Sequence, residues 1–303
     1  MHSVKSAAHL TGLPPDTLRA WEKRYGVVQP KRDAQGHRVY NAADVAKLSL
    51  LNRAVTLGHS IGRAARLSLP ELQDLVTGAR QDELDRLAPG LVQRALTAIE
   101  DYRPDACDEV LGIALATLAP VDVIRHVLSP LINQVGERWH RGELSVAQEH
   151  LLSASVERLL MVVIHTHLRA ARGPVIIFGT PSGERHALGS LEAAFLAASR
   201  GLRAFYLGPD LPAQELADAA ARLGAAVLAL SLVTIDALDD RLDQIRQLAA
   251  LLPHTIDLWL GGIATEHLSA DSLPIRCTIL HGIDDYLHRL DILQSSNRIG
   301  RTP

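Results

Sequence analysis

The chain has 303 residues, which is enough for two or three domains, and its 47% hydrophobic content allows each of them to bury a core. The net charge of −3 is unevenly spread: residues 1–75 carry 11 Lys and Arg against 6 Asp and Glu, whereas the remainder carries 20 against 28. A basic segment on an acidic body fits phosphate binding confined to one end of the chain. The two cysteines, Cys107 and Cys277, lie far apart and suggest neither a disulfide framework nor a zinc site.

No membrane or secretory segment is evident in the sequence. Met1 is followed by polar and small residues rather than by an apolar signal region. The longest apolar run, residues 159–164, is too short to span a bilayer. We therefore expect a soluble cytoplasmic protein without a membrane partner.

Residues 1–75 are predicted to form a winged helix–turn–helix domain. Gly12 is the stop signal of its first helix, and Trp21 lies on the buried side of its second. The predicted elements are helices over residues 3–12 and 16–23, a turn and short strand over residues 35–40 that form a wing, a helix beginning near Asn41, a helix over residues 60–67 and an exit helix from Ser68.

Residues 78–168 are predicted to form a four-helix bundle. Apolar residues recur at spacings of three and four in four segments with short connections, which is typical of packed neighbouring helices. Ser145 followed by Gln148 is a capping-box pair that marks the start of the last helix. The four segments are residues 84–99, 107–118, 121–139 and 145–168, and residues 169–173 form the expected linker.

Residues 174–293 are predicted to form an α/β domain with a doubly wound parallel sheet of Rossmann-like type. Short buried runs alternate with helical stretches, and ligands of such sheets bind beyond the carboxyl ends of the strands. A disordered tail is expected at residues 295–303. The predicted strands are residues 175–178, 204–207, 226–230, 256–260 and 275–280, and the predicted helices are residues 187–199, 212–223, 236–252 and 264–271.

The loop after the first of these strands reads Glu184-Arg-His186-Ala-Leu-Gly189. His186 has an imidazole nitrogen free for a metal, and Glu184 can fix its tautomer by accepting a hydrogen bond from the other ring nitrogen. Gly189 leaves room for a bulky nucleotide tail, and Gly261-Gly262 give the same clearance on the far side. Ser231 ends the third predicted strand and can line the same channel.

A second group of side chains lies where the last two bundle helices meet. Trp139 and His140 end one predicted helix, and Val146, Glu149 and His150 stand at i, i+3 and i+4 on one face of the next. An indole, a carboxylate and two imidazoles therefore converge. Together with the imidazole of the loop, they could surround one large flat metal cofactor.

The basic N-terminal domain supplies the candidate DNA contacts. A helix that begins with Asp16 and Thr17 can enter a major groove, where Arg19 would reach base edges or phosphate. Arginine and tyrosine side chains near the wing can bind phosphates. The candidate DNA-binding residues are Thr17, Arg19, Arg24, Tyr25, Arg32, Arg38 and Tyr40.

The N-terminal motifs resemble the winged helix–turn–helix of the MerR family. They are Ala7-Ala8-x-Leu10-Thr11-Gly12, Thr17-Leu18-Arg19-x-Trp21-Glu22-x-Arg24-Tyr25-Gly26 and Gly36-x-Arg38-x-Tyr40. The resemblance implies a homodimer on a roughly palindromic DNA site. The long dimerisation helix usual in that family is not evident after Leu67, so we expect the downstream domains to carry oligomerisation.

The Glu184-x-His186-x-x-Gly189 loop, with Ser231-Leu-Val233 and Gly261-Gly262, resembles the cobalamin-binding domain of methionine synthase and related mutases. The family pattern is D-x-H-x-x-G, S-x-L and G-G. Glu184 therefore replaces Asp, and Val233 replaces Leu. The resemblance implies that His186 displaces the dimethylbenzimidazole base of the cofactor and becomes the lower axial ligand of cobalt.

The spacing W-x9-E-H, from Trp139 to Glu149 and His150, resembles the light-sensing cap of CarH-type photoreceptors, called LitR in some lineages. Together the resemblances cover about residues 3–290 and imply adenosylcobalamin as the cofactor. Trp139 matches the residue that packs against the adenosyl group, Glu149 its ribose partner and His150 a neighbouring pocket residue. His140 matches the imidazole that can take the upper cobalt position after photolysis.

The resemblance implies a transcriptional regulator rather than an enzyme. We expect a dark repressor in which adenosylcobalamin supports a homotetramer of two dimers on double-stranded DNA, and in which light breaks the cobalt–carbon bond and ends repression. A light-independent regulator that binds another cobalamin form or another tetrapyrrole such as haem is an alternative. A corrinoid methyl carrier and a DNA-binding protein with an empty pocket are two more, and the MerR-type head counts against the carrier.

Overall fold

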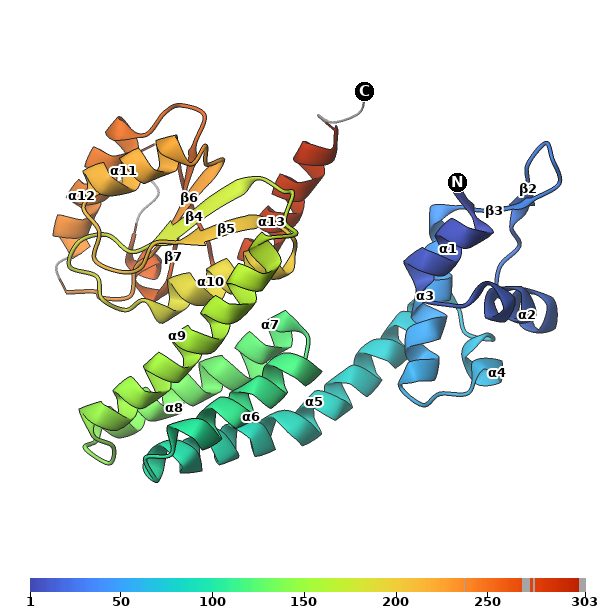
Figure 1. The fold of residues 1–303 in the computed structure, drawn as a ribbon, viewed down its shortest axis with the longest axis horizontal. Helices are drawn as coiled ribbons and strands as arrows, with labels where there is room; N and C mark the ends of the chain where they lie inside the picture. The colour runs from blue at the N-terminus through green and yellow to red at the C-terminus, as the bar shows by residue number, and fades with distance from the viewer. Residues whose placement is uncertain (237, 269–272, 275, 300–303) are drawn as a thin grey trace. The chain divides into compact units, whose positions relative to one another are not determined.

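One long helix, α5 (Leu69–Glu100), passes from the first structural unit of the chain into the second (Figure 1). The computed structural model describes residues 1–236, 238–268, 273–274 and 276–299, and the chain divides into Met1–Ala88 and Pro89–Pro303. The expected α/β domain and most of the expected bundle lie in the second unit, whereas residues 78–88 of the expected bundle fall in the first. The finer division into residues 1–75, 78–168 and 174–293 stays a prediction.

The first unit combines a small antiparallel sheet with helices that share one core. Gly12 and Gly26 end the first two helices in the left-handed conformation, with φ of 67° and 61°. Trp21 is buried in this core, as predicted. The elements are β1 (His2–Ser3), α1 (Val4–Thr11), α2 (Pro15–Tyr25), β2 (Lys31–Arg32), β3 (Arg38–Tyr40), α3 (Ala42–Thr56) and α4 (Ile61–Ala64), with strand order β1-β3-β2.

Two helices of this region differ from the sequence expectation. α4 is shorter than predicted because the amides of Arg66 and Leu67 bond to carbonyls three residues back and close the helix. α5 has 32 residues, so the expectation that no long helix follows Leu67 is wrong. The predicted exit helix from Ser68 and the predicted helix over residues 84–99 form one continuous helix, in which Pro89 lies inside and Leu91 beyond it is buried. Tertiary packing therefore overrides local propensity here.

The second half of α5 joins the other predicted helices in the bundle. The third predicted helix contains a π-helical turn, because Pro130 has no N–H to offer the carbonyl one turn back and the wider turn accommodates it. Ser145 and Gln148 form the capping box that the sequence predicted. The bundle elements are α6 (Pro104–Thr117), α7 (Pro120–Asp122), the π turn η1 (Val123–Leu128), α8 (Ser129–His140) and α9 (Val146–Leu168).

Among the described residues, α9 is the one helix long and apolar enough to cross a membrane, with a mean hydropathy of 1.3. This is weak evidence, since a core helix of a globular protein passes the same test of length and composition. In this structure α9 packs along α6 and α10.

Five parallel strands form the sheet of the second unit, in the order β5-β4-β6-β7-β8. The chain leaves β4 in both directions, so the topological switch point lies between β4 and β6, where ligands of such sheets bind at the carboxyl ends. The strands are β4 (Val175–Gly179), β5 (Arg203–Tyr206), β6 (Val227–Ser231), β7 (Asp257–Gly261) and β8 (Cys277–Ile279).

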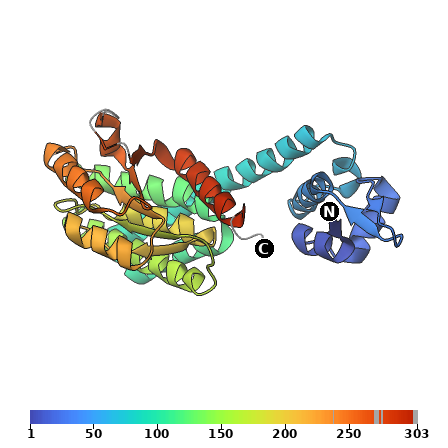
Figure 2. The same ribbon diagram turned by 90° about the horizontal axis from the view of Figure 1, so that it is seen from above.

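Helices cover both faces of this sheet (Figures 1 and 2). Ile177 and Leu228 pack in one core with α11 (Ala213–Arg222) and α12 (Leu238–Leu251). The other face is covered by α10 (Leu188–Ser199) and α13 (Gly282–Ile299). There Tyr286 of α13 stacks edge-on against Trp259 of β7 and donates its hydroxyl to the carbonyl of Ala193 on α10. The bundle packs on α10 through α9 and α7.

The C-terminal elements depart in part from the predicted ranges. The predicted helix over residues 264–271 is a short 3-10 helix, η2 (Ile263–His267), and residues 269–271 lie outside the described residues. The predicted strand over residues 275–280 is β8, with residue 275 outside the described part. The expected disorder is wrong for residues 295–299, which continue α13, because Gln294 anchors its last turns to the carbonyl of Arg200. Residues 300–303 lie outside the described part.

The glycine pair at the end of β7, Gly261 and Gly262, allows a test of backbone packing at this edge of the sheet. Gly262 has a φ of 96°, and a Cβ at this position would lie 2.2 Å from the carbonyl oxygen of Leu232. We expect Gly262→Ala to lower the free energy of unfolding by about 2 to 4 kcal/mol, since backbone strain and backbone overlap add. Gly261→Ala is the control, because a Cβ there meets no atom within 4 Å. Urea unfolding of both variants measures the difference, and equal losses of stability would contradict the expectation.

Candidate functional site

The imidazole of His186 is held at one nitrogen and open at the other. His186 follows β4 at the switch point, and its Nδ1 lies 2.7 Å from Oε1 of Glu184. The same oxygen accepts the backbone N–H of His186 at 3.0 Å. The side chain of His186 is 65% exposed. When Nδ1–H donates to a carboxylate, Nε2 keeps its lone pair, which is the state required of a metal ligand.

Glu184 is fully buried and remains ionised. Its Oε2 accepts the backbone N–H groups of Val233 at 2.9 Å and Thr234 at 2.7 Å, and the Thr234 hydroxyl donates to Oε1 at 3.1 Å. Burial alone would raise the pKa of Glu184. The hydrogen bonds from the amides of Thr234, His186 and Val233 outweigh burial and hold this pKa at about 2. The carboxylate therefore stays charged at neutral pH and selects the His186 tautomer with its proton on Nδ1.

The loop that carries this pair is anchored by two other elements. Asp210, which follows β5, accepts the N–H of Gly183 at 2.6 Å and donates its own N–H to the Thr180 hydroxyl at 2.9 Å. Arg241 of α12 donates to the carbonyl of Gly183 at 2.6 Å. These contacts fix the loop through the protein's own residues. His186 is therefore positioned in advance of any ligand.

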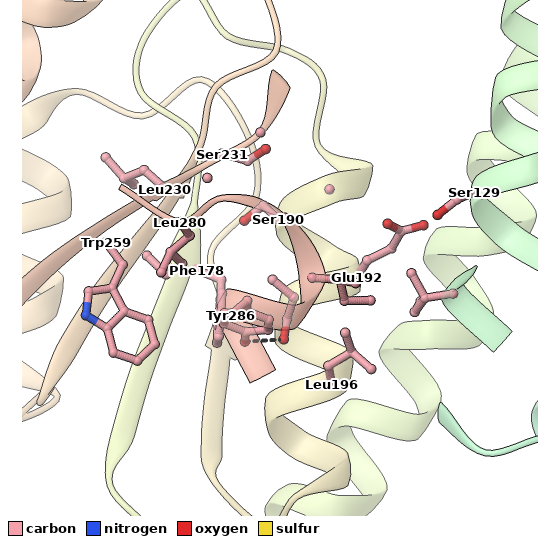
Figure 3. Close-up of a pocket in the computed structure, with 18 of the residues that line it drawn as sticks. Ser129, Phe178, Ser190, Glu192, Leu196, Leu230, Ser231, Trp259, Leu280 and Tyr286 are labelled. Carbon is pink, nitrogen blue, oxygen red and sulfur yellow. Dashed lines mark hydrogen bonds between the residues drawn. The ribbon is translucent and has the colours of Figure 1, made fainter. Parts of the chain in front are cut away.

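An apolar cavity of about 270 Å³ lies between the sheet, α10 and α13 (Figure 3). Its lining brings together four of the predicted residues: Gly189, Ser231, Gly261 and Gly262. A Cβ on Gly189 would lie 3.1 Å from Oγ of Ser231, so a side chain here would crowd that wall of the cavity. The apolar part of the lining includes Phe178, Leu196, Leu230, Trp259, Leu280 and Tyr286.

Two large apolar side chains are exposed at the same edge of the sheet. Ile235 follows β6 and Ile263 follows β7, and they are 50% and 59% exposed. Exposed apolar surface beside an open imidazole and an apolar cavity fits a large, partly apolar ligand that would cover it. Within the described part of the chain, no three His, Cys, Asp or Glu side chains group to hold a metal ion. These residues therefore fit a metal that arrives inside a cofactor and takes a single protein ligand.

The corner between α8 and α9 holds Trp139, His140 and Val146, three of the residues predicted to surround the cofactor. Trp139 is 40% exposed, and its ring meets that of His140 edge-on with the centroids 4.7 Å apart. Nδ1 of His140 lies 2.8 Å from the carbonyl oxygen of Gly136, so this imidazole also keeps Nε2 free. Val146 is exposed at the start of α9. An indole this open is available to a ligand.

Glu149 and His150 form a second contacting pair on α9. Nδ1 of His150 lies 2.9 Å from Oε2 of Glu149, and the Ser153 hydroxyl donates to Oε1 of Glu149 at 2.7 Å. The structure thus brings four of these residues together as two contacting pairs, Trp139 with His140 and Glu149 with His150. Their roles toward a cofactor stay predictions.

The predictions from sequence missed two things: the groups that hold Glu184 and its loop in place, and Glu192 in the lining of the cavity. Val233 and Thr234 donate backbone amides to Glu184, which leave no residue signature, and the Thr234 hydroxyl adds one side-chain hydrogen bond. Arg241 reaches Gly183 across 58 positions of the chain. Glu192, which lines the cavity, had a signal: it is an acidic residue between the apolar Leu191 and Ala193 of a helix predicted to cover a buried sheet.

In the first unit, four of the predicted DNA contacts lie on α2. Arg19 and Arg24 are exposed, and Thr17 and Tyr25 are half-buried. Arg19 pairs with Asp16 at 3.2 Å, and the Arg24 guanidinium lies 5.4 Å from the centroid of the Tyr25 ring. Exposed pairs of this kind are weak, so both arginines can turn to a phosphate.

The wing residues are tied to the domain itself. Arg32 is exposed and donates to the carbonyl of Gly36 at 2.7 Å. Nε of Arg38 lies 2.9 Å and 3.0 Å from the two carboxylate oxygens of Glu22, and the Tyr40 hydroxyl donates to the same carboxylate at 3.3 Å. Burial and the neighbouring Glu22 raise the pKa of Tyr40 to about 12. The expected phosphate contact of Tyr40 does not fit this structure, because its ring is fully buried in the core.

Two family models match parts of the chain. Residues 2–69 match the MerR HTH family of regulatory proteins, and residues 91–164 match the B12 binding domain family. The monomethylamine corrinoid protein of Methanosarcina barkeri shares the fold, with 16% identity and a TM-score of 0.53, over 67% of this chain and 99% of that chain.

Two curated relatives cover nearly the whole chain. The HTH-type transcriptional repressor CarH of Myxococcus xanthus is 33% identical over 94% of this chain and 96% of its own length. The HTH-type transcriptional repressor CarA of the same organism is 30% identical over 88% of each chain. Both relatives are DNA-binding regulators rather than enzymes. The chain therefore belongs to the CarH family of MerR-type transcriptional regulators with a cobalamin-binding domain.

Proposed function

We propose that the protein is a light-responsive transcriptional repressor that binds adenosylcobalamin in its second unit and double-stranded DNA through its first. The observation that carries the proposal is the open imidazole of His186, held by the ionised Glu184 beside an apolar cavity. His186 is the proposed lower axial ligand of cobalt. The cavity beside Gly189, Ser231 and the Gly261–Gly262 pair is the proposed place of the nucleotide tail. When bound, adenosylcobalamin supplies a cobalt–carbon bond that light can break.

The corner between α8 and α9 is the proposed sensor of the upper ligand. Trp139 and Val146 give an exposed apolar contact for the adenosyl group. Glu149 offers acceptors for ribose hydroxyls, and His150 beside it completes the pocket. His140, with its free Nε2, is the proposed upper ligand of cobalt after the adenosyl group has left. Loss of the contacts to that group would favour a second arrangement of the bundle.

Assembly is the proposed link between the cofactor and DNA. Several linked DNA-binding units hold DNA far more tightly than one unit does, so a change of oligomeric state changes occupancy. The loaded protein is proposed to form a homotetramer of two dimers, and α5 supplies the long helix that dimers of MerR-type proteins use. The cations proposed to contact DNA are Arg19, Arg24 and Arg32, with Thr17 and Tyr25 beside them and with Arg38 after release from Glu22.

A light-independent sensor of cobalamin supply would use the same His186 site. The exposed Trp139 and the Glu149 carboxylate favour the light-responsive alternative, because they fit an adenosyl group and have no partner in a methyl or hydroxo ligand. The repressor relatives argue against a corrinoid methyl carrier.

Illumination should dissociate the loaded protein. We expect protein loaded with adenosylcobalamin in the dark to have the mass of a tetramer and to shift operator DNA, and to lose both properties after green light. Light scattering before and after illumination measures the mass. Protein loaded with methylcobalamin is the control and should not assemble. A mass that does not change under light would rule out the proposed switch.

His186→Ala should weaken cobalamin binding at least about tenfold and remove the absorption spectrum of the His-ligated form, since one metal ligand and its tautomer control are lost together. Titration followed by visible absorption measures both effects. His254→Ala is the control, because His254 is exposed at the opposite edge of the sheet, before β7. Unchanged spectra in the His186 variant would show that another residue ligates cobalt.

His140→Ala should leave dark assembly intact but remove the bis-imidazole spectrum of the illuminated protein. His165→Ala is a matched control, since both imidazoles are exposed and each binds the carbonyl four residues back, at 2.8 Å for His140 and 2.9 Å for His165. Absorption spectra of both variants after illumination test the assignment. Persistence of the bis-imidazole bands in the His140 variant would contradict it.

A further inference from the structure

We infer that Glu192 makes the cavity selective for corrinoids whose nucleotide base carries a hydrogen-bond donor, such as adenine, over the dimethylbenzimidazole of cobalamin. The inference rests on the proposed function, because it requires the nucleotide tail to enter the cavity beside α10. It goes further by naming the class of corrinoid that the cavity prefers.

Glu192 is an acidic side chain in a largely apolar lining. It extends from α10 toward Ser129 of α8 (Figure 3). Its Oε1 atom is shut off from solvent and has no hydrogen-bond partner. Burial raises the pKa of Glu192 to about 7, so its carboxyl group is present in both neutral and ionised forms near neutral pH.

The other ionisable groups of the lining do not satisfy this carboxyl group. Arg125 of η1 pairs with Asp284 of α13. The hydroxyl of Tyr286 donates to the carbonyl of Ala193. Glu192 is therefore left with hydrogen-bonding capacity that a ligand in the cavity can use.

The unpaired Oε1 atom of Glu192 distinguishes ligands by whether they carry a hydrogen-bond donor that reaches it. Because Oε1 is already shielded from water without a ligand, a ligand that has no donor leaves it unpaired, whereas a ligand with a donor gains a hydrogen bond there. The outer edge of dimethylbenzimidazole carries two methyl groups and no donor. Adenine carries an amino group beside a ring nitrogen. A neutral carboxyl group can accept from the amino group and donate to the ring nitrogen, and an ionised one can still accept.

The base, rather than the phosphate of the tail, is the part that this site recognises. A phosphodiester is an anion, and an ionised Glu192 would repel it. A role in packing alone also fails to explain the residue, because an apolar side chain of similar size would fill the same space without an unpaired oxygen.

Binding of three corrinoids to the full-length protein tests the inference. The probes are hydroxocobalamin, its adenine-based analogue with the same upper ligand, and cobinamide, which lacks the nucleotide and reports changes outside the cavity. Dissociation constants come from visible absorption. We expect the protein to bind the adenine-based analogue at least about tenfold more tightly than hydroxocobalamin.

Two variants separate recognition from packing. Glu192→Leu should abolish the preference, by weakening the adenine-based analogue and strengthening hydroxocobalamin. Glu192→Gln should retain most of it, because an amide both accepts and donates. Equal affinities for the two corrinoids in the unmodified protein, with a ratio unchanged in Glu192→Leu, would overturn the inference and leave cobalamin binding intact. Failure of all three corrinoids to bind would overturn the proposed function as well.

Discussion

A single buried carboxylate holds the cofactor edge of this protein together. Glu184 is tolerated without solvent because five donors from the protein surround it, two from His186 and three from Val233 and Thr234. These hydrogen bonds can form only when the loop after β4 and the loop after β6 lie side by side, which is the geometry of the switch point. The orientation of the imidazole thus comes from the same bonds that stabilise the fold.

In the DNA-binding unit, the carboxylate of Glu22 likewise joins two separate elements by hydrogen bonds. This carboxylate of α2 binds Arg38 and Tyr40 of β3, so the helix expected to enter the major groove and the wing are tied to each other by side chains. Tyr40 also contributes a large apolar ring to the core. The hydrogen bonds to Glu22 fix the backbones of the helix and the wing relative to each other, while the exposed side chains of Arg19 and Arg32 stay free to turn.

The features that sequence predicted correctly depend on residues close in the chain. The capping box of Ser145 and Gln148, the Glu184–His186 bond and the alternation of strands and helices are all of this kind, because spacing and periodicity carry them. What sequence missed depends on distant partners or on packing. The amides around Glu184 have no residue identity, and the burial of Tyr40 follows from its position against α2. The joining of the exit helix to the helix over residues 84–99 as one helix, α5, has no local signal either.

The π turn η1 has a geometric consequence for the sensor corner. Each residue advances an α-helix by about 100°, and a π turn contains one residue more than an α turn. The extra residue shifts the angular phase of everything that follows it in α8. The direction in which Trp139 and His140 project therefore depends on the number of residues in η1, which ends about ten positions upstream.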